Sequence, residues 1–253
     1  MRALILGAGV GRRLNKPELP PKVLLRFEGE SLLARHIAIL RSCGLEHIDL
    51  VVGYRAERVE AELARIGAGD MVQTHFNPQY ERGAIVSLWT LRECLASGEP
   101  VIFMDGDVLY DHRMMERLLA SAHDNCFLMD RQTEEGEDPV KLCMRGGKLV
   151  DFHKRPEIEH DWWGEWIGFA RMSPEIAAKV AAAASDHVDS GNLDEMYEVA
   201  FRDVLLGQPD GGFQVEDVTG LPWVEIDFPE DLRRAQSEIL PQLAPIPGTV
   251  PAR

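Results

Sequence analysis

The sequence contains no lysine- or arginine-rich block, and this absence argues against a protein that binds duplex nucleic acid or an anionic membrane surface. Its 253 residues include 27 Lys and Arg against 42 Asp and Glu, a formal net charge of −15. Nor does any apolar run approach the roughly 20 residues of a membrane-spanning helix. We therefore expect neither a nucleic-acid nor a membrane partner, and an anionic substrate would need locally concentrated positive charge or a metal ion.

Paired cysteines, internal repeats and low-complexity segments are also missing. The four cysteines, Cys43, Cys94, Cys126 and Cys143, are scattered without a C-x-x-C pair. They are typical of small buried apolar residues in a reducing compartment. The apolar start at Met1–Gly7 runs directly into a glycine loop and is too short for the core of a signal peptide. The sequence therefore predicts a cytoplasmic protein.

What the sequence does contain is a regular alternation of short apolar runs and amphipathic helical patterns. This alternation predicts an α/β fold, a Rossmann-like, mostly parallel sheet flanked by helices. In the first half, strands are expected at 2–7, 47–52, 72–76 and 101–104, and helices at 31–43, 55–66, 84–95 and 112–122.

After about residue 124 consecutive short strand patterns predict a small antiparallel extension of the sheet. Its strands are expected at 126–130, 140–144, 149–153 and 166–171, followed by helices at 174–184 and 194–206, a strand at 223–226 and a helix at 229–239. We predict one domain over 1–240, with a catalytic core of about 1–125, an acceptor-binding part of about 126–240 and a loose Pro-rich tail at 241–253.

A glycine-rich loop follows the first predicted strand. Its sequence is Gly7-Ala8-Gly9-Val10-Gly11-Arg12-Arg13-Leu14, and Pro21-Lys22 comes soon after. A dinucleotide-binding loop is disfavoured because Arg12 breaks the G-x-G-x-x-G pattern and prolines prevent a helix there, and the Gly-Lys-Ser/Thr of a P-loop is absent. The loop amides can still wrap phosphates. The alternative is a tight turn with two surface cations.

Two predicted strand ends carry carboxylates. Asp105-Gly106-Asp107 ends a buried strand, and Asp227 follows the late strand Val224-Glu225-Ile226. Ligands bind at the carboxyl ends of parallel strands, and paired carboxylates near a phosphate loop suit a hard dication. Taken singly, the first pattern could be a turn and Asp227 a helix cap.

The pattern G-x-G-x-R-L followed by Pro-Lys resembles the signature of the nucleotidyltransferases that act on sugar phosphates and phosphocholine, which have a GT-A-like fold. The resemblance spans roughly residues 1–240, although Gly7 stands where the family usually has alanine. It implies a catalytic or triphosphate-binding role for Arg13, Lys22, Gly9 and Gly11. It also implies that Ala8 and Gly9 lie against the base. Asp107 and Asp227 would bind Mg²⁺.

The same resemblance extends to the nucleotide base. Ser87 stands where relatives place a serine at a helix start, and Gly53-Tyr54-Arg55 resembles a loop near the base. Gln79 or Arg82 could line the entrance. Similarity is closest to phosphocholine cytidylyltransferases, so CTP is the predicted nucleotide, although Ser87 could equally be an ordinary helix residue.

Three of the five tryptophans lie within Asp161-Trp162-Trp163-Gly164-Glu165-Trp166. Aromatic faces with nearby acids recognise quaternary ammonium groups. Lys154-Arg155-Pro156 resembles a segment that contacts the acceptor phosphate in sugar enzymes. The predicted acceptor site is therefore Lys154, Trp162, Trp163, Glu165, Trp166, Asp194 and Tyr197. The alternative is a β-ribbon with one face in the core.

These features predict a magnesium-dependent cytidylyltransferase that transfers CMP from CTP to a small acceptor such as phosphocholine or aminoethylphosphonate and releases pyrophosphate. No general base is needed, because a phosphate monoester, with a second pKa of about 6, is already anionic at neutral pH. A sugar- or polyol-phosphate enzyme, forming CDP-inositol or a dTDP- or UDP-sugar, is the first alternative. A nucleotide-binding protein without turnover is the second. The oligomeric state is not predicted.

Overall fold

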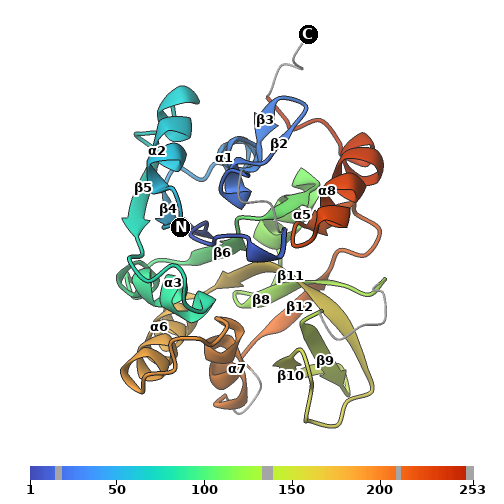
Figure 1. Cartoon of the computed structure of the whole chain (residues 1–253). Coiled ribbons are helices and arrows are strands. Elements are labelled where there is room, and N and C mark those ends of the chain that lie inside the picture. Colours follow the sequence, from blue (N-terminus) through green and yellow to red (C-terminus); the bar gives the residue numbers. More distant parts are fainter. Residues whose placement is uncertain (15–18, 133–138, 209–211, 249–253) are drawn as a thin grey trace.

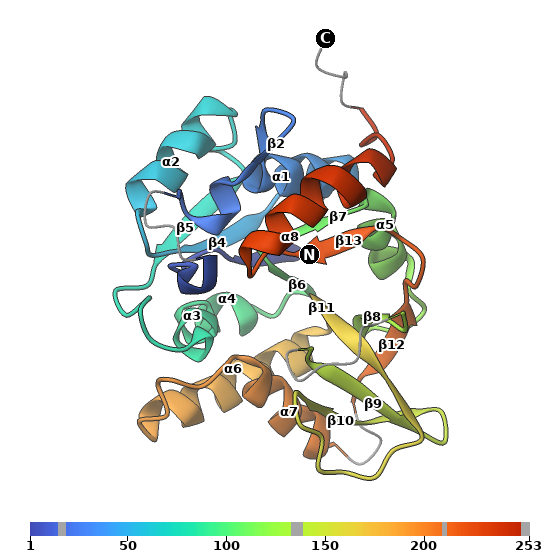
Figure 2. The same cartoon turned by 45° about the vertical axis from the view of Figure 1, so that its right-hand side comes forward.

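The computed structural model describes residues 1–14, 19–132, 139–208 and 212–248. Nine strands in this part of the chain form one sheet (Figures 1 and 2). They are β1 (Arg2–Leu6), β4 (Ile48–Val52), β5 (Val72–Phe76), β6 (Val101–Asp105), β8 (Cys126–Asp130), β9 (Lys141–Arg145), β10 (Lys148–His153), β11 (Trp162–Met172) and β12 (Gln214–Asp217). Their order is β10-β9-β11-β6-β1-β4-β5, with β8 paired to β11 and β12 paired to β8.

The parallel half of the sheet confirms the predicted α/β fold. β1 pairs in parallel with β4 and β6, and β4 pairs in parallel with β5. Leu6 at the end of β1 lies opposite Val51 of β4 and Asp105 of β6. The carboxyl ends of these three strands therefore meet at one edge, so the glycine loop after β1 lies beside the Asp105–Asp107 turn after β6.

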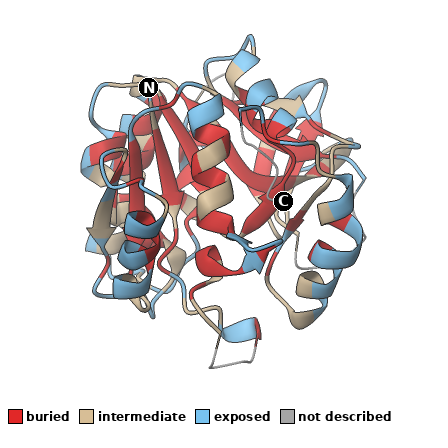
Figure 3. Cartoon of the chain, turned by 90° about the horizontal axis from the view of Figure 1, so that it is seen from above, coloured by how far each residue is buried: buried red, intermediate tan, exposed pale blue. Residues whose placement is uncertain are grey.

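Helices cover both faces of the sheet, and the sheet interior is buried between them (Figure 3). One face carries α1 (Leu32–Ser42), α2 (Ala56–Arg65) and α5 (His112–Ala120). The other carries α3 (Ala84–Thr90), α4 (Arg92–Leu95), α6 (Pro174–Asp189) and α7 (Glu198–Leu206). Within β1, Leu4 packs on the second face while Ala3 and Ile5 pack on the first, as the alternation of side chains along a strand requires.

The antiparallel extension is also present, and β11 joins it to the parallel half. This strand runs antiparallel to β6, β8 and β9. Its pairing with β8 shifts register between Trp166 and Ala170, and Gly168 between them has a φ of 89°. A Cβ atom on Gly168 would lie 2.6 Å from Asp105 Oδ2. Glycine therefore permits both the backbone angle and the close approach to Asp105.

Two small ribbons complete the fold. They are β2 (Arg26–Phe27) with β3 (Glu30–Ser31), and β7 (Val108–Tyr110) with β13 (Trp223–Glu225). The helix α8 (Pro229–Arg234) follows β13 and continues into a π-helical segment, Ala235–Ile239, and a 3₁₀ turn, Leu240–Gln242. The ribbon strands β2, β3 and β7, like β12, were not predicted, because runs of two to four residues are too short to show a period.

Some predicted boundaries were wrong. The helix expected at 84–95 is interrupted at Leu91, and the helix expected from Asp194 begins at Glu198. Residues 241–248 are not a loose tail, since the Ala244 N–H donates to Asp111 Oδ2 over 2.8 Å and Ile246 is buried in the core. Residues 249–253 lie outside the described part of the chain. Within that part, no helix is both long and apolar enough to cross a bilayer.

Glu62 of α2 connects this helix to the β2–β3 ribbon and to the start of α1. Its oxygens accept hydrogen bonds from Arg65 at 2.7 and 2.9 Å, from Arg26 at 2.9 Å and from Ser31 Oγ at 2.6 Å. The bonds from Arg65, with help from Ser31 and Arg26, lower the pKa of Glu62 to about 2 despite the opposing effect of burial.

Replacement of Glu62 by glutamine is expected to lower the free energy of unfolding by about 2 kcal/mol at pH 7, because charged hydrogen bonds to a buried group are lost. Since the folded pKa is depressed, this contribution is complete above the unfolded value of 4.5 and disappears as the pH falls toward 2. Urea unfolding at pH 7 and pH 3 measures both effects. The exposed Glu60→Gln on the same helix is the control. Equal stability of the two variants at pH 7 would contradict the prediction.

Candidate active site

Four charged side chains from three distant parts of the chain meet at the carboxyl edge of the sheet. Lys22 Nζ lies 2.8 Å from Asp107 Oδ2 and 2.6 Å from Asp227 Oδ1. Arg13 Nη1 lies 3.0 Å from Asp227 Oδ2. These are the two cations and the two carboxylates that the sequence singled out, and we call them the charged centre.

Local backbone structure fixes Lys22 beside the glycine loop. Lys22 begins a 3₁₀ turn, Lys22–Leu24, which follows Pro21 and is anchored by the buried Val23. The loop residue Gly11 has a φ of 67°, and a Cβ atom there would lie 3.2 Å from Lys22 Cγ. The loop therefore packs directly against the lysine stem, and glycine allows that approach.

The turn that carries Asp107 is held by its glycine. The Gly106 N–H donates to the Leu6 carbonyl over 3.0 Å, and the Gly106 carbonyl accepts from His36 Nε2 over 3.0 Å. Burial lowers the pKa of His36 to about 4, so the imidazole is neutral at pH 7 and carries its proton on Nε2. A Cβ atom on Gly106 would lie 2.6 Å from both the Leu6 oxygen and Val23 Cγ1. The turn is thus tightly enclosed.

Glu225 is a third carboxylate at the charged centre, and it was not among the predicted site residues. One oxygen each of Asp107, Glu225 and Asp227 lies within 4.8 Å of the others. Glu225 ends β13, two residues before Asp227, so their period-two spacing was the signal that could have revealed it.

The electrostatics of the centre keep its lysine charged. Burial by itself would lower the pKa of Lys22, but Asp107 and Asp227 outweigh it and raise that pKa above its ordinary value. Deeper in the site, burial and then the negative charges of Asp107 and Glu225 raise the pKa of Asp105 well above its usual range. Asp105 accepts a hydrogen bond from the Tyr197 hydroxyl.

A cavity of about 530 Å³ opens beside the charged centre and reaches the antiparallel extension. The sequence-predicted residues that line it are Ala8, Gly9, Arg13, Lys22, Ser87, Asp107, Lys154, Glu165, Trp166, Tyr197 and Asp227. Tyr80, Glu198 and Arg234 also line it and were not predicted. The Ser87 hydroxyl accepts a 3.1 Å hydrogen bond from the Asn77 side-chain amide, which fixes the orientation of Ser87.

Three predicted nucleotide- or acceptor-site residues lie just outside the described lining of the cavity. Gly11 packs behind the loop against Lys22. The ring of Tyr54 is centred 6.3 Å from that of Tyr80, which does line the cavity. Asp194 accepts a 2.8 Å hydrogen bond from Arg82, another lining residue. Each of the three therefore supports a neighbouring group rather than the cavity wall itself.

The tryptophan segment does not form the predicted aromatic cage. Trp162 and Trp163 are absent from the described cavity lining, and cations lie over their rings instead, Arg131 at 4.6 Å and Lys141 at 5.1 Å. Of the three tryptophans in this segment, Trp166 alone is in the described cavity lining, and its Nε1–H donates to the Tyr197 hydroxyl over 3.1 Å. The surroundings of Trp162 and Trp163 therefore fit the alternative interpretation, a β-ribbon, better than an aromatic cage.

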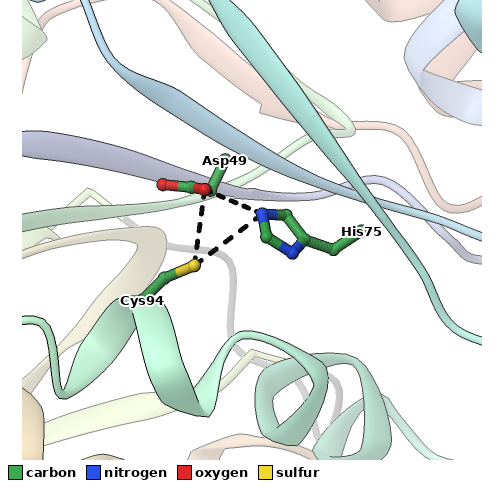
Figure 4. A group of neighbouring side chains, drawn as sticks. All are labelled: Asp49, His75 and Cys94. Atoms are coloured by element: carbon green, nitrogen blue, oxygen red, sulfur yellow. Dashed lines mark hydrogen bonds and ion pairs between the residues drawn. The ribbon is translucent and has the colours of Figure 1, made fainter.

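A second polar cluster, Asp49, His75 and Cys94, lies away from the described cavity lining (Figure 4). Asp49 Oδ1 accepts from His75 Nε2 over 2.7 Å and from Cys94 Sγ over 3.3 Å. Burial and then Asp49 raise the pKa of Cys94 to about 12, so its thiol keeps the proton that it donates. The three groups satisfy one another, and the cluster fastens α4 to β4 and β5.

Comparison with known proteins assigns the family. The model of the MobA-like NTP transferase domain matches residues 3–187, and the chain belongs to this family. The protein is therefore a nucleotidyltransferase, as the sequence analysis predicted.

Curated relatives include cytidylyltransferases, and a solved structure of one shares the fold. The chain is 23% identical to a CTP:phosphoglutamine cytidylyltransferase of Campylobacter jejuni, across 92% of this chain and 98% of that protein. It is 26% identical to a CMP-5'-(3-aminopropyl)phosphonate synthase of Streptomyces rubellomurinus, across 95% of this chain but only 39% of that protein. A solved CTP:phosphocholine cytidylyltransferase from Streptococcus pneumoniae superposes with a TM-score of 0.72 at 21% identity, covering 93% of this chain and 97% of that one.

Proposed function

We propose that this protein is a cytoplasmic enzyme that transfers CMP from CTP to a small phosphorylated or phosphonylated acceptor. The observation that carries the proposal is the charged centre, in which Lys22 and Arg13 meet two strand-end carboxylates beside a glycine loop. Cations and loop amides suit a triphosphate, and carboxylates suit a metal ion that accompanies it. The four free cysteines support a reducing compartment.

The acidic residues of the centre fit a magnesium ion. Asp107, Glu225 and Asp227 offer only oxygen ligands, the type that a hard dication prefers, and their oxygens converge within 4.8 Å. The ammonium of Lys22 lies between Asp107 and Asp227, so positive charge is already favoured at this point. Asp107 and Asp227, with Glu225 beside them, would hold the ion, which would supply positive charge to the reacting phosphates.

The chemistry requires positioning rather than proton transfer. An anionic oxygen of the acceptor phosphate or phosphonate attacks the α-phosphorus of CTP, a new P–O bond forms, and the bond from this phosphorus to the bridging oxygen breaks. The electron pair leaves with pyrophosphate. Lys22 and Arg13 neutralise the triphosphate oxygens, and the loop after β1 presents its amides to them.

We assign the acceptor to the part of the cavity that Lys154, Glu165, Trp166 and Tyr197 line. Aminoethylphosphonate and phosphocholine are the candidate acceptors. The names of the Campylobacter and Streptomyces relatives support an acceptor that carries nitrogen as well as phosphorus. A polyol phosphate is the second candidate, because the carboxylates of this wall can also accept hydrogen bonds from hydroxyl groups.

Pyrophosphate release tests the proposal. Purified protein with Mg²⁺ is incubated with CTP, UTP, dTTP or GTP and with aminoethylphosphonate, phosphocholine, inositol 1-phosphate or glucose 1-phosphate. Pyrophosphate is expected with CTP and an amino-alcohol acceptor, and not with CTP alone. Preferential use of UTP or dTTP with glucose 1-phosphate would overturn the cytidylyl assignment.

A further inference from the structure

Glu198 is a buried carboxyl group on the cavity wall that the proposed chemistry leaves unused. It is the first residue of α7, and its exposed fraction is 8%. Its Oε2 atom has no hydrogen-bond partner among the described residues. A buried polar oxygen without a partner costs free energy, so the site is incomplete without a hydrogen-bond donor.

A purely structural role does not account for Glu198. An acid in the first turn of a helix is stabilised by the helix dipole, but that benefit is also available to an exposed side chain. Burial raises the pKa of Glu198 to about 7, and its own backbone N–H, followed by Lys154 and His153, offsets this effect only in part. The terminal torsion of a glutamate is soft, so a small rotation can present either oxygen to the cavity.

The surrounding charges favour a cationic donor. The acidic side chains of Asp105, Glu165 and Glu225 line the same cavity as Glu198. A primary ammonium group brings both a positive charge and N–H donors. A trimethylammonium group brings charge without a donor, and the Trp162 and Trp163 rings that would form its cage lie outside the described lining.

We propose that Glu198 binds a primary ammonium group of the acceptor, so that the enzyme selects aminoalkyl phosphates or phosphonates over their trimethylammonium counterparts. This proposal rests on the proposed function, since it names the acceptor of the same cavity. Lys154 is the neighbouring cation on that wall and can hold an additional anionic group of the acceptor. The acceptor phosphorus then faces the charged centre and the ammonium faces α7.

Three acceptors that differ only in the terminal group test the proposal: phosphoethanolamine, phosphocholine and 2-hydroxyethyl phosphate. At pH 8, kcat/KM with CTP is expected to be about a hundredfold higher for phosphoethanolamine than for the other two, because phosphocholine has the charge without a donor and 2-hydroxyethyl phosphate has a donor without the charge. Glu198→Gln is expected to remove most of that preference through a higher KM for phosphoethanolamine, with the KM for CTP unchanged. Glu195→Gln, an exposed site near the start of the same helix, is the matched control.

Equilibrium binding separates this proposal from the proposed function. Calorimetry measures the affinity of the wild-type and Glu198→Gln proteins for aminoethylphosphonate in the presence of Mg²⁺ and CMP. This measurement tests the role of Glu198 even if no acceptor releases pyrophosphate. Weaker binding to the variant supports the proposal. Equal binding to both proteins, or a wild-type preference for phosphocholine or for 2-hydroxyethyl phosphate, overturns it. Absence of pyrophosphate with every acceptor overturns the proposed function instead.

Discussion

Replacement of Lys22 by alanine is expected to lower kcat/KM about a thousandfold, the loss typical of a single electrostatic clamp on reacting phosphates. Its ammonium touches both Asp107 and Asp227, so it offsets the two carboxylates that would otherwise repel a triphosphate. Both the turnover number and the affinity for CTP should fall. Pyrophosphate release and calorimetry with CTP measure the two effects separately.

Lys179→Ala is the matched control for this variant, because Lys179 pairs with Glu175 on the outer surface of α6. It is expected to retain wild-type activity. The Lys22 variant also leaves Asp107 and Asp227 facing each other without a cation. Its thermal stability without Mg²⁺ should therefore fall more than its stability with Mg²⁺. A loss of activity smaller than tenfold, with the fold intact, would show that Lys22 is not part of the active centre.

The second large effect is expected at the carboxylates. Asp107→Asn and Asp227→Asn should each lower kcat about a thousandfold, and each should shift the Mg²⁺ dependence of the remaining activity to higher concentration. The physical reason is that an amide keeps the shape of the side chain but removes the negative charge that attracts a dication. Activity measured over a titration with MgCl₂ reports the shift.

The double variant Asp107→Asn/Asp227→Asn should lose little more than either single variant, because residues that act on one ion as a unit are not additive. Asp186→Asn, at an exposed position on α6, serves as the control. Independent, multiplicative losses with an unchanged Mg²⁺ midpoint would contradict a shared metal site. They would point instead to separate effects on Lys22 and Arg13.

The parallel half of the fold was predictable because its signals are local. The strands β1, β4 and β6 are short, mostly apolar runs, and α1 with its Ser31 cap has an apolar face of period 3.6. The glycine loop and Asp107 could then be placed at one edge by the general geometry of parallel sheets. Asp227 required the resemblance to a known family, because nothing local says that its strand returns to that edge.

The tryptophan side of the cavity was less predictable because it depends on the position of side chains along β11. This strand has eleven residues, and Glu165, Trp166 and Gly168 line the cavity, whereas Trp162 and Trp163 lie further back along the strand, where it pairs with β9. A cluster of tryptophans suggested a cage, whereas Trp166 reaches the cavity and Trp162 lies under Arg131. Glu198 had no sequence signal at all, since an acid at a helix start is commonplace.

The sequence by itself determined the class of fold, the glycine loop with the cations beside it, and the identity of two strand-end acids. It could do so because hydrophobic periodicity, glycine and proline determine backbone structure over a few residues. In addition, the carboxyl ends of parallel strands lie at the same edge of a sheet. The tertiary structure alone decided that residues 22, 107 and 227 touch, that Glu225 joins them, and which side chains line the cavity. Those features depend on contacts between segments up to 205 residues apart, which no local pattern encodes.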